Sequence, residues 1–132
     1  MPYLLDTHAV IAVLNDTTSR AAARLRAERP SEVAVSAIVM HELFYGAFRS
    51  ARRDRNLDLV DRLRFAVLDF SKEDAREAGE VRALLAAQGT PIGPYDILIA
   101  GQARARGLVL VTRNTGEFAR VPGLRIEDWE AG

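Results

Sequence analysis

The sequence has no cysteine, and this absence excludes disulfide bonds, thiolate metal sites and cysteine nucleophiles. It also has no long hydrophobic run, since none approaches the ~20 residues that span a bilayer. Residues 1–6 lack the basic start and the long apolar segment of a signal peptide. We therefore expect a soluble, cytoplasmic protein that does not associate with a membrane.

A net charge is also missing, because 18 basic residues balance 18 acidic ones. Any affinity for nucleic acid must therefore come from a local separation of charge. Lys72 is the only lysine, so nearly all of the positive charge is arginine. Arginine suits bidentate phosphate contacts, but a GC-rich genome enriches it equally, and the composition leaves both explanations open.

Short apolar runs that alternate with helical patterns predict the fold. The predicted strands are residues 3–5, 33–35, 66–68, 108–111 and 124–126. The intervening helices are expected to start near residues 7, 17, 37, 51, 71 and 94. Strands separated by helical periods are typical of βαβ units. We expect a single α/β domain over residues 1–132, with a mostly parallel sheet, the first strand near its centre and helices on both faces.

Acidic residues stand where predicted strands end or helices begin. Asp6 follows the first strand; it can cap the next helix, as Thr7 can, or it can act in a site. Asp96 falls in the first turn of the helix that Pro94 starts, at the head of an apolar stripe. Glu117 follows the buried strand 108–111. Because ligands bind beyond the carboxyl ends of strands in open α/β sheets, these acids are expected to gather there.

Glu42 lies on an otherwise apolar face of the helix 37–50. Its neighbours three and four positions away are Ile38, Val39, Tyr45 and Gly46. An unpaired buried carboxylate is costly, so Glu42 needs a cation, a salt bridge or a functional role. The opposite side of this helix is also apolar, which indicates burial against a second surface such as another subunit.

Four carboxylates in one place cannot all remain ionised without a counter-ion. Two unit charges about 5 Å apart repel by roughly 3 kcal/mol at an effective dielectric near 20. Oxygen-only ligands, with no histidine pair at i, i+4 spacing, favour Mg²⁺ or Mn²⁺ over zinc. Such an ion can activate water for attack on a phosphodiester. We therefore predict a metal-dependent nuclease in which Asp6, Asp96, Glu42 and Glu117 hold the metal or orient the water.

The segment 49–64 is rich in arginine and is the best candidate for a surface that follows RNA phosphates. It also contains three aspartates, so a solvated, salt-bridged helix face explains the charges equally well. The candidate RNA contacts are Arg49, Arg52 and Arg53.

Several motifs together resemble the PIN-domain ribonucleases, and specifically the VapC toxins of bacterial toxin–antitoxin pairs. They are L-L-D-T at 4–7, the Ser36-to-Glu42 spacing followed by Tyr45-Gly46, P-I-G-P-Y-D at 91–96, V-T-R-N-T-G-E-F at 111–118 and the tail at 121–129. The resemblance covers essentially the whole chain. It implies a three-layer α/β fold, Mg²⁺-dependent cleavage of structured RNA such as tRNA, homodimerisation, and inhibition by a cognate VapB antitoxin within a larger assembly.

Two positions depart from the family pattern. His8 stands where members often have Asn or Ser, and Asn114 stands where many have Asp. We expect Thr7, Thr112 and Asn114 to support the site and Glu117 to supply its fourth charge. Whether Glu117 or Asn114 completes the site is left open by the sequence.

Two phosphate-handling alternatives fit the sequence poorly. A phosphatase of the haloacid dehalogenase type needs a second aspartate where His8 stands, and a lysine that Lys72 is badly placed to supply. A receiver-like phosphorylation switch would use Asp6 and Asp69, but this sequence lacks the required lysine after a late strand.

Two further alternatives concern RNA. A metal-free ribonuclease would need His8 and His41 to face each other; it would leave a cyclic phosphate and work in EDTA. A catalytically silent PIN-type module that binds RNA or antitoxin is the second alternative. The presence of Asp6, Glu42 and Asp96 together argues against it.

Overall fold

The predicted apolar runs form a single five-stranded sheet in the computed structural model, which describes residues 2–131. All pairings are parallel and the strand order is β3-β2-β1-β4-β5. The strands are β1 Tyr3–Leu5, β2 Val33–Ser36, β3 Ala66–Leu68, β4 Val109–Val111 and β5 Arg125–Glu127. The central position of the first strand and the edge position of the last are therefore as expected.

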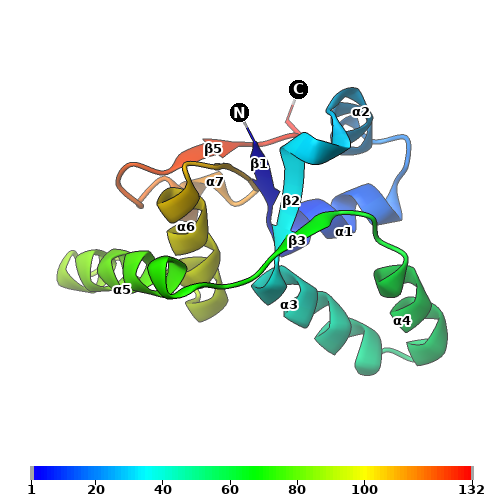
Figure 1. Cartoon of the computed structure of the whole chain (residues 1–132), viewed down its shortest axis with the longest axis horizontal. Helices are drawn as coiled ribbons and strands as arrows, with labels where there is room; N and C mark the ends of the chain where they lie inside the picture. The colour runs from blue at the N-terminus through cyan, green and yellow to red at the C-terminus, as the bar shows by residue number, and fades with distance from the viewer. Residues whose placement is uncertain (1, 132) are drawn as a thin grey trace.

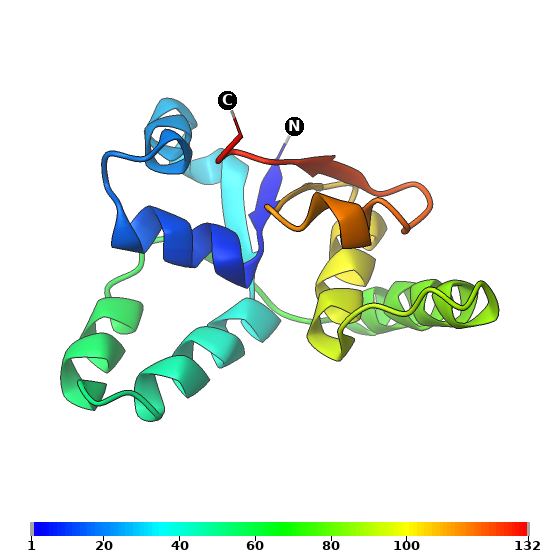
Figure 2. The same cartoon turned by 180° about the vertical axis from the view of Figure 1, so that it is seen from behind.

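Helices cover both faces of this sheet. They are α1 Thr7–Asn15, α2 Arg20–Ala27, α3 Ala37–Phe48, α4 Arg53–Asp61, α5 Lys72–Ala87, α6 Pro94–Arg106 and α7 Thr115–Phe118, with a 3₁₀ turn η1 at Pro30–Glu32. Helices α5 and α6 pack together to one side, while α1 to α4 lie to the other (Figures 1 and 2). This arrangement confirms the expected three-layer α/β fold. Right-handed βαβ connections place the helices of a parallel sheet on its two faces in this way.

Two helices begin later than predicted. Helix α2 starts at Arg20 because Ser19 caps it, its hydroxyl accepting from Ala22 N at 3.1 Å. Thr18 instead donates its backbone N–H to the Asp16 carboxylate at 2.9 Å in a turn. Helix α4 starts at Arg53 without a side-chain cap. For α2, local hydrogen bonds of short polar side chains therefore decide the boundary.

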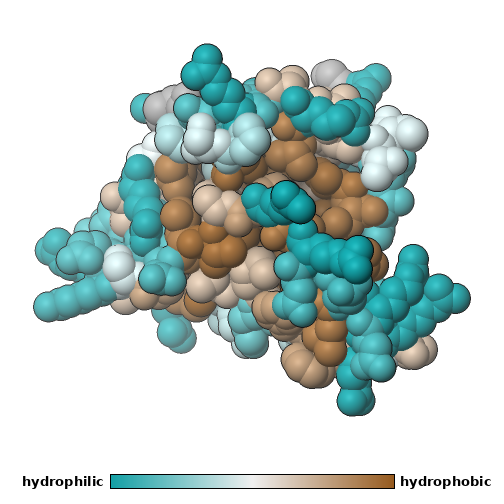
Figure 3. Space-filling model, turned by 45° about the vertical axis from the view of Figure 1, so that its right-hand side comes forward, coloured by the Kyte–Doolittle hydropathy of each residue, from teal (hydrophilic) through white to brown (hydrophobic). Residues whose placement is uncertain are grey.

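Only one side of α3 is covered by the chain itself. Val39, Leu43 and Ala47 are buried, whereas Tyr45 and Phe48 are 59% and 55% exposed. Figure 3 shows a broad apolar area bordered by hydrophilic side chains on one face of the molecule. Within residues 2–131, no helix has the length and apolar character needed to cross a bilayer.

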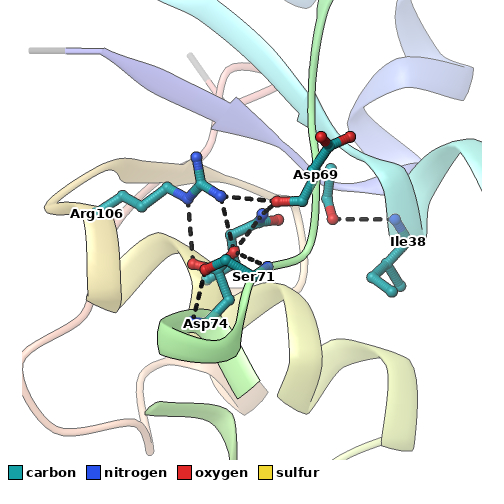
Figure 4. Close-up of polar contacts among 7 residues, drawn as sticks. Ile38, Asp69, Ser71, Asp74 and Arg106 are labelled. Atoms are coloured by element: carbon teal, nitrogen blue, oxygen red, sulfur yellow. Dashed lines mark hydrogen bonds and ion pairs between the residues drawn. The ribbon is translucent and has the colours of Figure 1, made fainter. Parts of the chain in front are cut away.

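An ion pair, which the sequence did not reveal, fastens the start of α5 to the end of α6 (Figure 4). The predicted capping box is present, with the Ser71 hydroxyl and the Asp74 carboxylate each accepting from the other's backbone N–H. Asp74 is 1% exposed and also accepts from Arg106 Nη2 at 2.8 Å and from Gln102 Nε2 at 3.0 Å. Arg106 and Gln102 both donate to the carbonyl of Asp69 as well. Asp69 is therefore part of the turn, as expected.

Helices α5 and α6 also approach each other very closely. A Cβ added at Gly101 would lie 2.4 Å from Ala78 Cα, so only glycine fits there. This close approach and the Asp74–Arg106 pair fix the position of α6, whose first turn carries Asp96.

Candidate active site

The sheet register brings the ends of three strands to one edge. Leu5 pairs with Val35 on one side and with Val111 on the other, so the next residues, Asp6 and Thr112, lie together. The Asp6 N–H donates to the carbonyl of Val111 at 3.0 Å, which continues the ladder by one bond. This edge is where chemistry is expected in a parallel sheet.

Asp6 caps α1 and also lies at this edge, so its capping role is confirmed, while its role in a functional site stays a prediction. It is 3% exposed, and its Oδ1 accepts from Ala9 N at 2.8 Å. The alternative cap, Thr7, is wrong: Thr7 is the first helical residue, and its hydroxyl donates to Glu42 Oε1 at 3.0 Å. Thr7 therefore joins α1 to the Glu42 carboxylate on α3, and its supporting role in a site stays a prediction.

Asp96 lies in the first turn of α6, which begins at Pro94 as predicted. Gly93 precedes it, and a Cβ there would lie 3.2 Å from Asp96 Oδ2. The absence of a side chain at Gly93 therefore leaves room for this carboxylate. The sequence indicated the helix start but not this requirement.

The side chains of Glu117 and Asn114 are hydrogen-bonded to each other. The Asn114 amide donates to Glu117 Oε2 at 2.7 Å, and the Asn114 backbone N–H donates to Thr112 Oγ1 at 2.9 Å. Thr112 is 1% exposed, and its hydroxyl lowers the pKa of Asp6 through a hydrogen bond. Asn114 thus links Thr112, which follows β4 beside Asp6, to Glu117.

Three other acids lie close enough to Asp96 to affect its protonation. Burial, and then the charges of Asp6, Glu42 and Glu117 in that order of effect, together raise the pKa of Asp96 to about 6. His8 opposes this increase. Burial also raises the pKa of Asp6, against the lowering effects of Thr112 and of the Ala9 N–H. We call Asp6, Glu42, Asp96 and Glu117 the acidic cluster.

The donor set of the acidic cluster fits a hard divalent cation, because it offers only oxygen ligands and carries repulsion that a cation relieves. In the part of the chain that the structure describes, however, no three Asp, Glu or His side chains are arranged closely enough to hold an ion as they stand. The fit therefore rests on chemistry and charge, and ligation requires the side chains to move inward.

The three candidate RNA-contact arginines lie outside the acidic cluster, at the corner between α3 and α4. Arg52 and Arg53 line an open hollow there, and Arg53 Nε donates to the Phe48 carbonyl at 3.2 Å. Among residues 2–131, the neighbouring Arg62 forms an ion pair with Asp58, but Arg49, Arg52 and Arg53 form none. No acidic side chain of the described residues neutralises these three arginines, and their contact with RNA stays a prediction.

Comparison with known proteins agrees with the fold and with the motifs. The model of the PIN domain family matches residues 3–124. The tRNA(fMet)-specific endonuclease VapC of Salmonella typhimurium is 43% identical over 131 residues, covering 98% of this chain and 98% of that protein. The protein of the same name from Shigella flexneri is 40% identical over 131 residues, with 98% of each covered.

A solved structure gives the same result in three dimensions. The crystal structure of DNA-bound VapBC from Salmonella typhimurium contains a chain that superposes with a TM-score of 0.92 at 43% identity, covering 98% of both chains. PIN-domain nucleases of the VapC type generally depend on a divalent metal ion. The chain belongs to the PIN-domain family, and within it to the VapC ribonucleases.

Proposed function

We propose that this protein is the toxin of a type II toxin–antitoxin pair and cleaves structured RNA, with tRNA as the substrate class, in a reaction that depends on Mg²⁺ or Mn²⁺. The observation that carries the proposal is the acidic cluster, in which burial and three other carboxylates raise the pKa of Asp96. Relatives named as tRNA endonucleases support the choice of substrate.

We assign the roles within the acidic cluster as follows. Asp6 and Asp96 are direct metal ligands, and Glu117 completes the set or holds a second, weaker ion. Glu42 is a further ligand or orients the attacking water: Thr7 holds its Oε1, which leaves Oε2 free for either role. When bound, the divalent ion neutralises charge on the phosphoryl group and makes water a better nucleophile.

The remaining residues of the site position these acids. The helix cap fixes Asp6, and Asn114 fixes Glu117, each through a bond of 2.7–2.8 Å. These two bonds restrict the carboxylates of Asp6 and Glu117, which lowers the entropy lost when the acids close around a metal ion.

Replacing Asp96 by Asn tests the proposal directly. We expect loss of Mg²⁺-dependent cleavage of a tRNA mixture, measured by mapping RNA ends, because a direct ligand is removed. Asp69→Asn is the matched control, since Asp69 also follows a strand but contributes its carbonyl rather than its carboxylate. Cleavage by Asp96→Asn at the normal rate would exclude the ligand role.

The same assay separates the two alternative functions. Cleavage in EDTA with a cyclic phosphate product would indicate the histidine mechanism. No cleavage by the unsubstituted protein would indicate a catalytically silent binding module.

We also propose that the chain acts in the cytoplasm, forms a homodimer and binds a VapB-type antitoxin that blocks the acidic cluster within a larger assembly. The solved VapBC relative supports the antitoxin partner. The stripe Met40, Phe44 and Phe48 on α3 suits a second copy, because Phe48 is 55% exposed and the other two are only partly buried. Phe48→Glu places a charge in this stripe and is expected to give a monomer by size-exclusion chromatography with light scattering. An unchanged dimer would show that the dimer interface does not include this stripe.

A further inference from the structure

We propose that an aromatic track beside the acidic cluster stacks unpaired RNA bases and thereby selects single-stranded segments such as loops. The track consists of His41, Tyr45 and Arg49 on α3 together with Tyr95 on α6. This proposal deepens the ribonuclease function proposed above and rests on it.

Two residues of the track are adjacent in the chain to members of the acidic cluster. His41, Tyr45 and Arg49 follow i, i+4, i+8 spacing, so they form one stripe that extends about 12 Å along the helix. His41 immediately precedes Glu42, and Tyr95 immediately precedes Asp96. The track is separate from the neighbouring apolar stripe that begins at Met40, which we assign to a second copy.

Tyr95 and His41 form the first part of the track and join α6 to α3. Their ring centroids lie 5.2 Å apart with planes tilted by 55°. Tyr95 is 46% exposed and His41 is also exposed, so the pair leaves aromatic surface open to solvent rather than filling the core. Two rings held together by neighbouring elements offer a base a fixed surface at low entropic cost.

Tyr45 and Arg49 form the second part. The Arg49 guanidinium lies 5.4 Å from the centroid of the Tyr45 ring, and its Nη1 donates to the Tyr45 hydroxyl at 3.4 Å. Tyr45 is nevertheless 59% exposed. The arginine covers part of the ring and orients it, while the remaining surface can receive a base.

The surrounding charges favour RNA as the occupant. The acidic cluster repels backbone phosphate until a cation is bound, so part of the binding energy must come from interactions that are independent of charge. Stacking supplies such interactions. Arg52 and Arg53, just beyond the end of the track, can attract the phosphates that follow. Because bases in a duplex are already stacked and paired, the track accepts only unpaired strands.

The test measures RNA binding without cleavage. In an Asp96→Asn background, an RNA oligonucleotide that carries 2-aminopurine is expected to lose fluorescence on binding as the base stacks. Tyr95→Leu and Tyr45→Leu should each weaken binding about 5- to 150-fold and restore the fluorescence, without changing the dependence of affinity on salt. Tyr95→Phe keeps the ring and should keep the quenching. Leu84→Ala, which removes a 38% exposed side chain on α5, is the control and should bind normally.

Three results would overturn the proposal: normal affinity and quenching in both leucine variants, equal binding of the same sequence as a duplex, or a loss of binding that follows a loss of dimer in light scattering. The third result would mean that these rings contact a second copy of the chain rather than RNA bases. The ribonuclease function is judged separately by cleavage of the unsubstituted protein, so quenching without any cleavage would support the track while rejecting the nuclease.

Discussion

Asp96 ties the stability of the protein to pH. Its pKa is about 6 in the folded protein against an ordinary value of 3.8, so the folded state binds the proton more tightly than the unfolded state. The resulting stabilisation is complete below pH 3.8 and is lost as the pH rises through about 6. At neutral pH the ionised carboxylate therefore costs stability when no cation is present.

We accordingly expect Asp96→Asn to be more stable than the unsubstituted protein at pH 7 in EDTA. The difference in unfolding free energy should be about 1 kcal/mol, because Asp96 is only partly buried and solvent screens it, and it should vanish near pH 4. Urea unfolding of both proteins between pH 4 and pH 7.5 measures the difference. A difference that does not change with pH would mean that the charge of Asp96 is not the cause.

Gly93 provides a second test at the residue scale. Alanine is compatible with its backbone, at φ −54° and ψ 147°, but the new Cβ would lie 3.2 Å from Asp96 Oδ2 and displace the carboxylate by a few tenths of an ångström. We expect Gly93→Ala to lower the cleavage rate roughly 10- to 100-fold with little change in stability. Gly79→Ala is the control, since a Cβ there meets nothing within 4 Å. Equal rates in the two variants would contradict the steric argument.

At the scale of elements, α6 is held in place by its packing against α5. Burial raises the pKa of Asp74, but the bonds from Arg106, Ser71 N and Gln102 outweigh this effect and lower it overall. A lowered pKa stabilises the fold above the ordinary range of aspartate, and this stabilisation disappears at lower pH. The Asp74–Arg106 ion pair between α5 and α6 therefore gives its full stabilisation at neutral pH.

Arg106→Leu should destabilise the protein by about 2 to 4 kcal/mol, because it leaves the buried carboxylate of Asp74 without its cation. Arg62→Leu, which breaks an exposed pair with Asp58, should cost less than about 1 kcal/mol. In a double-mutant cycle, Asp74→Asn should recover part of the loss in the Arg106→Leu protein. Strict additivity of the two substitutions would show that the pair contributes no coupling.

At the scale of the whole molecule, a net charge of zero conceals two separated regions. The acidic cluster lies at the carboxyl edge of the sheet, and the arginines lie at the corner between α3 and α4. We expect the arginines to attract the phosphates of an RNA that the acidic cluster, without a cation, would repel.

Changing Arg52 and Arg53 together to Ala should weaken RNA binding and lower the slope of log affinity against log salt by up to about 1.4. This value allows about 0.7 for each phosphate of a single strand that no longer meets an arginine. Filter binding at a series of salt concentrations measures the slope. Arg125→Ala is the control: Arg125 lies exposed on β5, and its replacement should leave the slope unchanged. An unaltered slope in the double variant would show that Arg52 and Arg53 are exposed to solvent but do not contact RNA phosphates.

Local patterns in the sequence were sufficient for the elements and for their order along the chain. The apolar runs predicted all five strands, Pro94 predicted the start of α6, and Ser71 with Asp74 predicted the capping box. The same patterns placed Asp6, Asp96 and Glu117 beside the ends of strands or the start of a helix. These features depend on residues close together in the chain, which is why a single sequence reveals them.

Interactions between distant residues were decided only by the tertiary structure. The bonds of Thr7 to Glu42 and of Arg106 to Asp74, the room that Gly93 leaves for Asp96, and the exposure of Tyr45 all depend on how helices pack across 30 residues or more, or on side-chain placement within a turn. The sequence determined which groups could take part in chemistry, because their types and spacing are local. Packing determined which of them meet and how strongly, because distance and burial set their interaction energies.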